Sequence, residues 1–154
     1  MNLREFIVSG AVVADLKAKT RDDAIRELVA SLCSAGAVEQ SASDEIVAAL
    51  IKREKNGSTG FGKGVAVPHV KHSAVKKMVG TVGRSVDGID FLALDSQPVY
   101  TIFLLLSPEN QPQQHLQAMN IVFSNLQKDM FRKFLRQSDT SQKIIDLLDE
   151  ADGK

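Results

Sequence analysis

Three histidines are the residues of this chain best suited to carry chemistry, and two of them stand at unusual places. The 154-residue sequence has histidine only at positions 69, 72 and 115. His69 follows Pro68 directly after a glycine-rich loop. His115 stands where a helix is expected to begin after Pro112, and the free amides of a helix N-terminus favour a bound phosphate. His72 has no such setting, so we expect it to be an ordinary polar residue.

The loop before His69 combines close backbone approach with positive charge. Four glycines fall within residues 57–64, and glycine lets backbone amides come near a ligand. Residues 51–85 contain eight Lys or Arg and one acid, Glu54, so their net charge is 8 − 1 = +7, and the rest of the chain carries −7. This pattern alone leaves two interpretations open, a solvated lysine-rich face and a local anion site.

A histidine beside an anion site suits phosphoryl transfer. Neutral imidazole is nucleophilic, and a pKa of about 6.5 leaves much of it neutral at pH 7. The phosphoramidate that it forms is reactive enough to give the group up again. Cations and amides nearby would stabilise charge on the transferring group. His69 is therefore the candidate phosphoryl acceptor.

The spacing of apolar residues predicts an α/β fold, with a mixed β-sheet flanked by helices on both faces in a single domain. Thr20 and Asp23 stand at capping-box spacing, and the stripe Leu116, Met119, Phe123 and Leu126 predicts a long helix after Pro112. We expect one domain over residues 1–150 and a frayed tail over 151–154. The other predicted elements are strands over 11–16, 65–67, 79–86 and 99–106, and helices over about 20–35, 43–56, 130–135 and 141–148.

Composition narrows the class of protein. Apolar content is 44%, and nineteen basic side chains balance nineteen acidic ones, which argues against a general nucleic-acid or membrane binder. Apolar runs such as 102–106 are too short to span a bilayer. Cys33 is the only cysteine, so no internal disulfide can form, and we expect it to pack as a small apolar residue. We expect a cytoplasmic protein.

The residues around the glycine loop resemble a known motif. Arg53 and Glu54, followed by Gly57 to His69 (GSTGFGKGVAVPH), resemble the active site of the enzyme IIA components of the phosphoenolpyruvate-dependent sugar phosphotransferase system. The type is the mannitol/fructose one, which includes the nitrogen-regulatory IIA proteins. His115 with Leu116 resembles that family's second histidine. The resemblance covers about residues 3 to 148.

The resemblance implies a role for each site residue. His69 would accept a phosphoryl group at Nε2 from phospho-HPr or a paralogue of it, and pass it to an EIIB protein. Arg53 would lie near the phosphoryl group, and His115 would orient or stabilise it. Ser58 and Thr59 are weaker candidates for hydrogen bonds to phosphate. The resemblance implies a protein-histidine phosphotransferase component, with no cofactor or metal, no nucleic-acid partner and no direct insertion into a membrane.

The sequence is also compatible with three functions other than phosphoryl transfer to an EIIB protein. In a regulatory, nitrogen-type IIA protein, phosphorylation of His69 would only control which partner is bound. A metal site could use His69, His72 and His115, but Pro68 and the predicted strand make that geometry unfavourable. An RNA-binding role would use the basic segment, where Phe61 is the one aromatic residue available for stacking.

Overall fold

The computed structural model describes residues 1–153 and is built around one central strand, β4 (Val99–Ser107). β4 pairs in parallel with β1 (Val65–Ala66) and β2 (His69–Lys71), and antiparallel with β3 (Val79–Ile89). The predicted α/β fold with a mixed sheet is confirmed.

The sequence of β4 explains its central place. Ile102, Leu104 and Leu106 point into one hydrophobic cluster, and Phe103 and Leu105 point into a second cluster on the other face. All five side chains are fully buried. A strand that is apolar on both faces must be covered on both faces, so β4 requires helices above and below the sheet.

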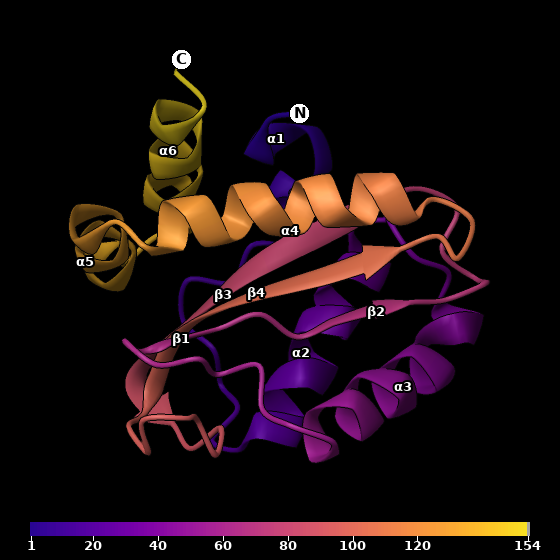
Figure 1. Ribbon diagram of the computed structural model, residues 1–154, viewed down its shortest axis with the longest axis horizontal. Coiled ribbons are helices and arrows are strands. Elements are labelled where there is room, and N and C mark those ends of the chain that lie inside the picture. Colours follow the sequence, from indigo (N-terminus) through magenta and orange to yellow (C-terminus); the bar gives the residue numbers. More distant parts are fainter. Residues whose placement is uncertain (154) are drawn as a thin grey trace.

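Helices supply that cover in two groups (Figure 1). α2 and α3 pack on one face, and α1, α4, α5 and α6 pack on the other. The structure also has short 3₁₀ turns at Ser9–Ala11 and Gln40–Ala42. The helices are α1 (Leu3–Phe6), α2 (Arg21–Ser34), α3 (Ser43–Lys55), α4 (Pro112–Leu126), α5 (Asp129–Gln137) and α6 (Ser141–Ala151).

The predicted starts of α2 and α4 agree with the structure, and the residues at each start explain why the helix begins there. The Thr20 hydroxyl accepts a hydrogen bond from the Asp23 amide at 3.2 Å, which satisfies one of the free amides at the start of α2. Pro112 is the first residue of α4, where its missing N–H costs nothing. The start of the helix that carries His115 is therefore set by the chain before any partner binds.

The predicted strand over residues 11–16 is wrong. The 3₁₀ turn at Ser9–Ala11 includes the first residue of this segment, which then meets β3 at one isolated bridge, between Val13 and Gly83. Val13 donates to Val82 O and accepts from Arg84 N, both at 2.9 Å. With so few ladder bonds the chain lies beside β3 without forming a strand.

The predicted core stripe of α4 is wrong for Leu116. This side chain is 60% exposed, whereas Ala118, Met119 and Val122 are buried. At 100° per residue Leu116 lies about 120° around the helix from the centre of the buried stripe. An exposed leucine next to His115 is thus a surface feature rather than a core residue.

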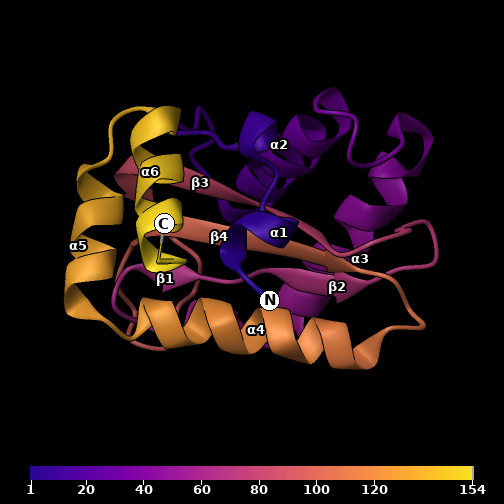
Figure 2. The same cartoon turned by 90° about the horizontal axis from the view of Figure 1, so that it is seen from above.

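The two ends of the chain are tied together (Figure 2). The Asp152 carboxylate accepts hydrogen bonds from the Leu3 amide at 2.8 Å and the Arg4 amide at 2.9 Å. Arg4 also pairs with Asp149 at 2.7 Å. Residues 151 and 152, which we expected in a frayed tail, are therefore ordered. Lys154 of that predicted tail lies outside the described residues. Within residues 1–153 no helix is both long and apolar enough to cross a bilayer.

Glycine in β3 permits the close packing on which this layered fold depends. A Cβ at Gly83 would lie 2.8 Å from Leu28 Cδ2 and 3.0 Å from Leu16 Cδ1. Gly83→Ala should therefore lower the free energy of unfolding by about 1–3 kcal/mol, the usual cost of overpacking a core. Urea denaturation measures this cost. Gly10→Ala is the control, because a Cβ there meets only Ala35 Cβ at 3.8 Å. Equal stability of the two variants would contradict the packing argument.

Candidate functional site

The edge of the sheet places His69. β1 and β2 both pair with β4, and Pro68 lies between them. Pro68 has no N–H to donate, but its carbonyl accepts from Leu105 N at 2.9 Å and so keeps the edge in register. Val67 N donates to Thr59 O at 3.3 Å, which ties the edge to the glycine-rich loop. His69 is thus held at the first position of β2.

One hydrogen bond defines the protonation pattern of His69. Its Nδ1 lies 2.7 Å from the Val67 carbonyl oxygen. A carbonyl can only accept, so Nδ1 carries the proton. In the neutral ring Nε2 then holds the lone pair and is the nucleophilic atom. The predicted use of Nε2 fits this arrangement.

The pKa of His69 is shifted in the direction that keeps the ring neutral. Burial lowers the pKa below 6.5, and the charges of Arg53 and Lys71 lower it further. The Val67 carbonyl and the Glu54 carboxylate act in the opposite direction but do not reverse the shift. His69 is accordingly neutral at pH 7, as a nucleophile must be.

His115 lies beside His69. It is the fourth residue of α4, and its ring centroid is 5.5 Å from that of His69 with 46° between the planes. Burial is the main cause that lowers the pKa of His115, followed by the charges of His69 and Lys71. The two histidines predicted for the site are therefore brought together by β2 and the first turn of α4.

Ser107 is a site residue that the sequence analysis missed. Its buried hydroxyl lies 2.6 Å from His115 Nδ1 and 2.8 Å from Met78 Sδ. The hydroxyl has one proton, so when it donates to the sulfur it must accept from Nδ1–H of His115. With that proton on Nδ1, the outward Nε2 of a neutral His115 ring carries no proton, and Nε2 donates only when the ring is protonated. The sequence feature that could have pointed to Ser107 is its place as a polar residue at the end of an apolar strand, just before Pro108.

Arg53 and the glycine-rich loop form the other wall of the site. The Arg53 guanidinium donates to Gly57 O at 2.7 Å and remains exposed. Its charge reaches His69, since it lowers the pKa of that ring. A guanidinium anchored at one nitrogen keeps further N–H groups free for an anion.

Glu54 organises the loop from inside, which the sequence analysis did not foresee. Its carboxylate is 3% exposed and accepts from the Thr59 amide at 3.0 Å and from the Thr59 hydroxyl. The Ser58 hydroxyl donates to Phe91 O at 2.8 Å. Both hydroxyl protons are thus used within the loop in this conformation. Phosphate binding by Ser58 and Thr59 stays a prediction, and the contacts support a role in shaping the loop.

His72 is separated from the other two histidines. Its Nδ1 accepts from Ala74 N at 3.0 Å, and its Nε2 lies 3.6 Å from the Glu45 carboxylate of α3. It thus faces the helix layer opposite to the one that carries His115. Within residues 1–153 no group of three or more His, Cys, Asp or Glu side chains is arranged to hold a metal ion.

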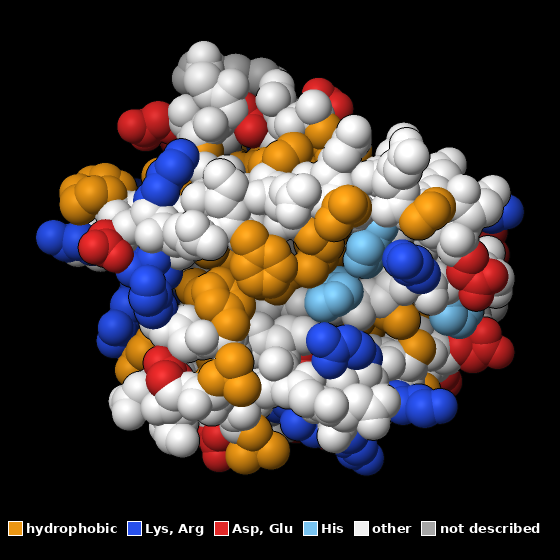
Figure 3. Space-filling model, in the orientation of Figure 1, with side chains coloured by type: hydrophobic (Ala, Val, Ile, Leu, Met, Phe, Trp, Pro, Cys, Tyr) orange, Lys and Arg blue, Asp and Glu red, His pale blue; other side chains and the backbone are white. Residues whose placement is uncertain are grey.

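The histidine pair lies at a surface that is apolar on one side and basic on another (Figure 3). Two histidine side chains lie together, with hydrophobic side chains on one side and Lys or Arg side chains close by. Leu116 is exposed beside His115, and Phe61 packs on Phe123 with a centroid separation of 5.0 Å. Such an open, partly apolar surface can receive a reactive group that is itself carried by another protein.

The sequence and the fold of this chain are similar to those of known proteins. Residues 5–151 match the family described as "Phosphoenolpyruvate-dependent sugar phosphotransferase system, EIIA 2". The chain is 34% identical over 148 residues to a nitrogen regulatory protein of Bradyrhizobium diazoefficiens, covering 96% of this chain and 95% of that one. The crystal structure of nitrogen regulatory protein IIA-Ntr from Neisseria meningitidis superposes with a TM-score of 0.83 at 28% identity, covering 94% of this chain and 97% of that one.

A longer relative shows the same likeness over a smaller share of its length. The fructose-specific EIIABC component of Bacillus subtilis is 31% identical over 153 residues, which is 99% of this chain but 24% of that protein. This chain therefore spans about a quarter of that relative and nearly all of the nitrogen regulatory one.

The lowered pKa values of the histidine pair make stability depend on pH. Both rings bind a proton less readily in the folded chain than in the unfolded chain, where the pKa is about 6.5. The unfolded state gains protons first as pH falls, so the free energy of unfolding should decrease from about pH 6.5 downward, through the folded pKa values. Urea midpoints measured across pH test this, and His69→Gln should reduce the slope. An unchanged slope would contradict the burial argument.

Proposed function

Because the chain belongs to the EIIA 2 family of the phosphoenolpyruvate-dependent sugar phosphotransferase system, we propose that His69 carries a phosphoryl group from one partner protein to another. The observation that carries this proposal is the 2.7 Å contact between His69 Nδ1 and the Val67 carbonyl. It leaves Nε2 with the lone pair, on a ring whose pKa is lowered by burial. The site thus has a neutral nucleophile at an open surface.

The chemistry is a transfer between two nitrogens. The Nε2 lone pair of His69 attacks the phosphorus of a phosphohistidine on HPr or a paralogue of it. The Nε2–P bond forms while the donor N–P bond breaks, and the electron pair leaves with the donor ring. The hydrogen bond from Nδ1–H to Val67 O persists and supports the cationic character that the ring gains on attack. Onward transfer reverses the same step with a new acceptor.

The neighbouring groups stabilise charge on the transferring group. Arg53 offers N–H groups that its bond to Gly57 O leaves free, and a planar guanidinium fork matches phosphoryl oxygens. His115, with its ring 5.5 Å from that of His69, can donate to the group from Nε2 when the ring is protonated. Ser107 fixes the other nitrogen of that ring and is a positioning residue.

We further propose an EIIB protein as the acceptor, with the reaction in the cytoplasm. The name of the B. subtilis relative, a fructose-specific EIIABC component, supports this acceptor. The exposed Leu116 beside His115, together with the Phe61–Phe123 pair about two turns further along α4, provides the apolar contact that two docked proteins need.

A second function, regulation by phosphorylation state, has its own support. The nitrogen regulatory relative matches over 95% of its length. In that function His69 would still accept the phosphoryl group, but a target protein would bind only one of the two states. The two functions share the site and differ in what happens after it is loaded.

Loading of the site tests the role of each histidine. With phosphoenolpyruvate, enzyme I and HPr present, His69→Gln should take up no label, because it lacks the nucleophilic nitrogen. His115→Ala should still be labelled but about a hundredfold more slowly, the usual cost of losing one donor at a developing charge. The measurement is the rate of acid-labile phosphate incorporation. His72→Gln is the matched control and should behave as the unsubstituted chain, since His72 faces Glu45.

Stoichiometric labelling of a folded His69→Gln chain would reject the proposal. Arg53→Lys keeps the charge without the planar fork, so it should slow loading less than Arg53→Gln does. Equal rates for the two variants and the unsubstituted chain would remove Arg53 from the site.

The fate of the loaded group separates the two functions. Chain phosphorylated at His69 should transfer to an EIIB protein of the same genome within seconds in the transport function. In the regulatory function no EIIB accepts it, and a target binds either the phosphorylated chain or His69→Gln, but not both. Stopped-flow transfer assays and binding measurements in both states decide between them. Association with the phospho-donor should also weaken as salt rises, because Lys71 and Arg53 flank the site.

A further inference from the structure

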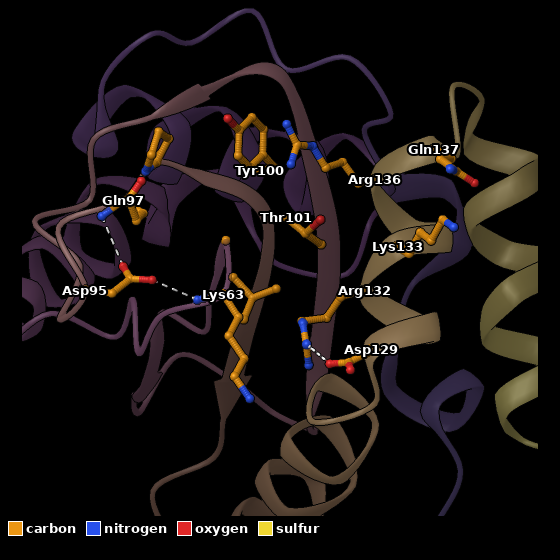
Figure 4. A pocket seen from close by; sticks show the side chains of 13 residues that line it. Lys63, Asp95, Gln97, Tyr100, Thr101, Asp129, Arg132, Lys133, Arg136 and Gln137 are labelled. Atoms are coloured by element: carbon orange, nitrogen blue, oxygen red, sulfur yellow. Dashed lines mark hydrogen bonds and ion pairs between the residues drawn. The ribbon is translucent and has the colours of Figure 1, made fainter.

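A cavity lies apart from the histidine pair, in a groove between α5 and the edge of the sheet (Figure 4). Its volume is about 750 Å³, and it is lined by the loop around Lys63, the start of β4 and one side of α5. Val65 of β1 lies in its wall, four residues before His69, which is about 13 Å along an extended strand. The mechanism proposed above uses none of its side chains.

The charges of this groove are predominantly positive. Four cations, Lys63, Arg132, Lys133 and Arg136, stand against two acids, so the lining carries 4 − 2 = +2. Both acidic side chains already have partners within the groove. Asp95 accepts from the amides of Lys63 at 3.0 Å and Gln97 at 3.1 Å, and Asp129 pairs with Arg132.

Arg136 is held in a geometry that suits phosphate. Its guanidinium carbon lies 3.5 Å from the centre of the Tyr100 ring, so the planar group is stacked on the aromatic face. Stacking restrains the plane but leaves the N–H groups at its edge free to donate. Among residues 1–153, neither Arg136 nor Lys63 forms an ion pair.

Lys63 completes the arrangement from the other wall. Its φ of +62° is uncommon for a residue with a side chain, and the bond from its amide to Asp95 fixes the backbone there. The exposed side chain therefore extends from a restrained backbone across the groove from α5.

We propose that this groove binds a small organic anion that carries more than one phosphate charge. Unpaired cations on two walls suit phosphate, and a stacked arginine provides a planar fork of donors. Pro98 and Tyr100 add apolar surface for the organic part. A concave site of this volume fits a small molecule rather than the surface of a docked protein. A nucleoside diphosphate and a sugar bisphosphate share this chemistry.

The test uses three probes on the full chain: inorganic pyrophosphate, ADP and fructose 1,6-bisphosphate. Calorimetry should show saturable 1:1 binding of at least one organic probe, and amide resonances of Gly64, Tyr100 and Lys133 should shift. Preference for ADP or for the sugar bisphosphate identifies the source of the phosphate. His69→Gln should bind equally well, so this result does not depend on the phosphocarrier role.

Charge removal makes the test specific. Lys63→Gln/Arg136→Gln should weaken binding of the organic probe about tenfold or more, because each hydrogen bond from a charged side chain to phosphate adds to the binding free energy. Lys76→Gln/Lys77→Gln is the control, since both are exposed cations outside the groove. If the first variant does not fold, Lys133→Gln alone should weaken binding severalfold.

Three outcomes overturn the proposal. These are the absence of saturable binding by any probe at millimolar concentration, shifts centred on His69 and His115, and equal weakening by the control pair. If no probe binds and phosphoryl transfer is slower in Lys63→Gln/Arg136→Gln, the groove is assigned to a protein partner instead.

Discussion

The hydrogen bond from His69 Nδ1 to the Val67 carbonyl is the contact on which the site depends. It spans only two residues, and extended backbone around Pro68 makes it possible. Most of the fold serves to hold that backbone. β4 fixes the edge from inside, with Leu105 N bonded to Pro68 O, and the helix layers bury β4 on both faces. The Thr59 carbonyl holds Val67 from the side of the glycine-rich loop. The tautomer of His69 therefore depends on the packing of the whole sheet, because that packing fixes the backbone that carries the Val67 carbonyl.

The electrostatics of the site fit a group that gains and loses charge. Before loading, burial and neighbouring cations lower the pKa values of both His69 and His115, so the pair is neutral and can approach to 5.5 Å. A phosphoryl group on His69 would add about two negative charges and would raise the pKa of His115. His115 would then become protonated and donate to that group. The cations that lower the pKa of His69 in the empty site would also attract the negative charge of a phosphoryl group on it.

Sequence patterns were sufficient wherever a local rule decided the outcome. The cap at Thr20, proline at the start of α4 and the doubly apolar β4 predicted the fold, because each acts within a few residues or along one strand. The pairing of His69 with His115 followed from the family resemblance and not from spacing. The roles of Glu54 and Ser107 were missed and Leu116 was wrongly placed in the core for one shared reason: each depends on which side of an element faces a neighbour. Periodicity indicates that a helix has a buried side but does not fix its rotation to within one residue.

The two basic regions of the molecule differ in shape, and shape determines what each can accept. Arg53 and Lys71 flank a pair of half-buried rings on an open, partly apolar face, which suits a reactive group carried by another protein. Lys63 and Arg136 line different walls of a concavity of about 750 Å³, which encloses a free small molecule better than a protein surface. Both regions border the same edge of the sheet, one at Val65 and the other at His69. The Val67 carbonyl that sets the His69 tautomer therefore stands on the strand segment between the two regions, and each region takes its shape from a different wall beside that segment.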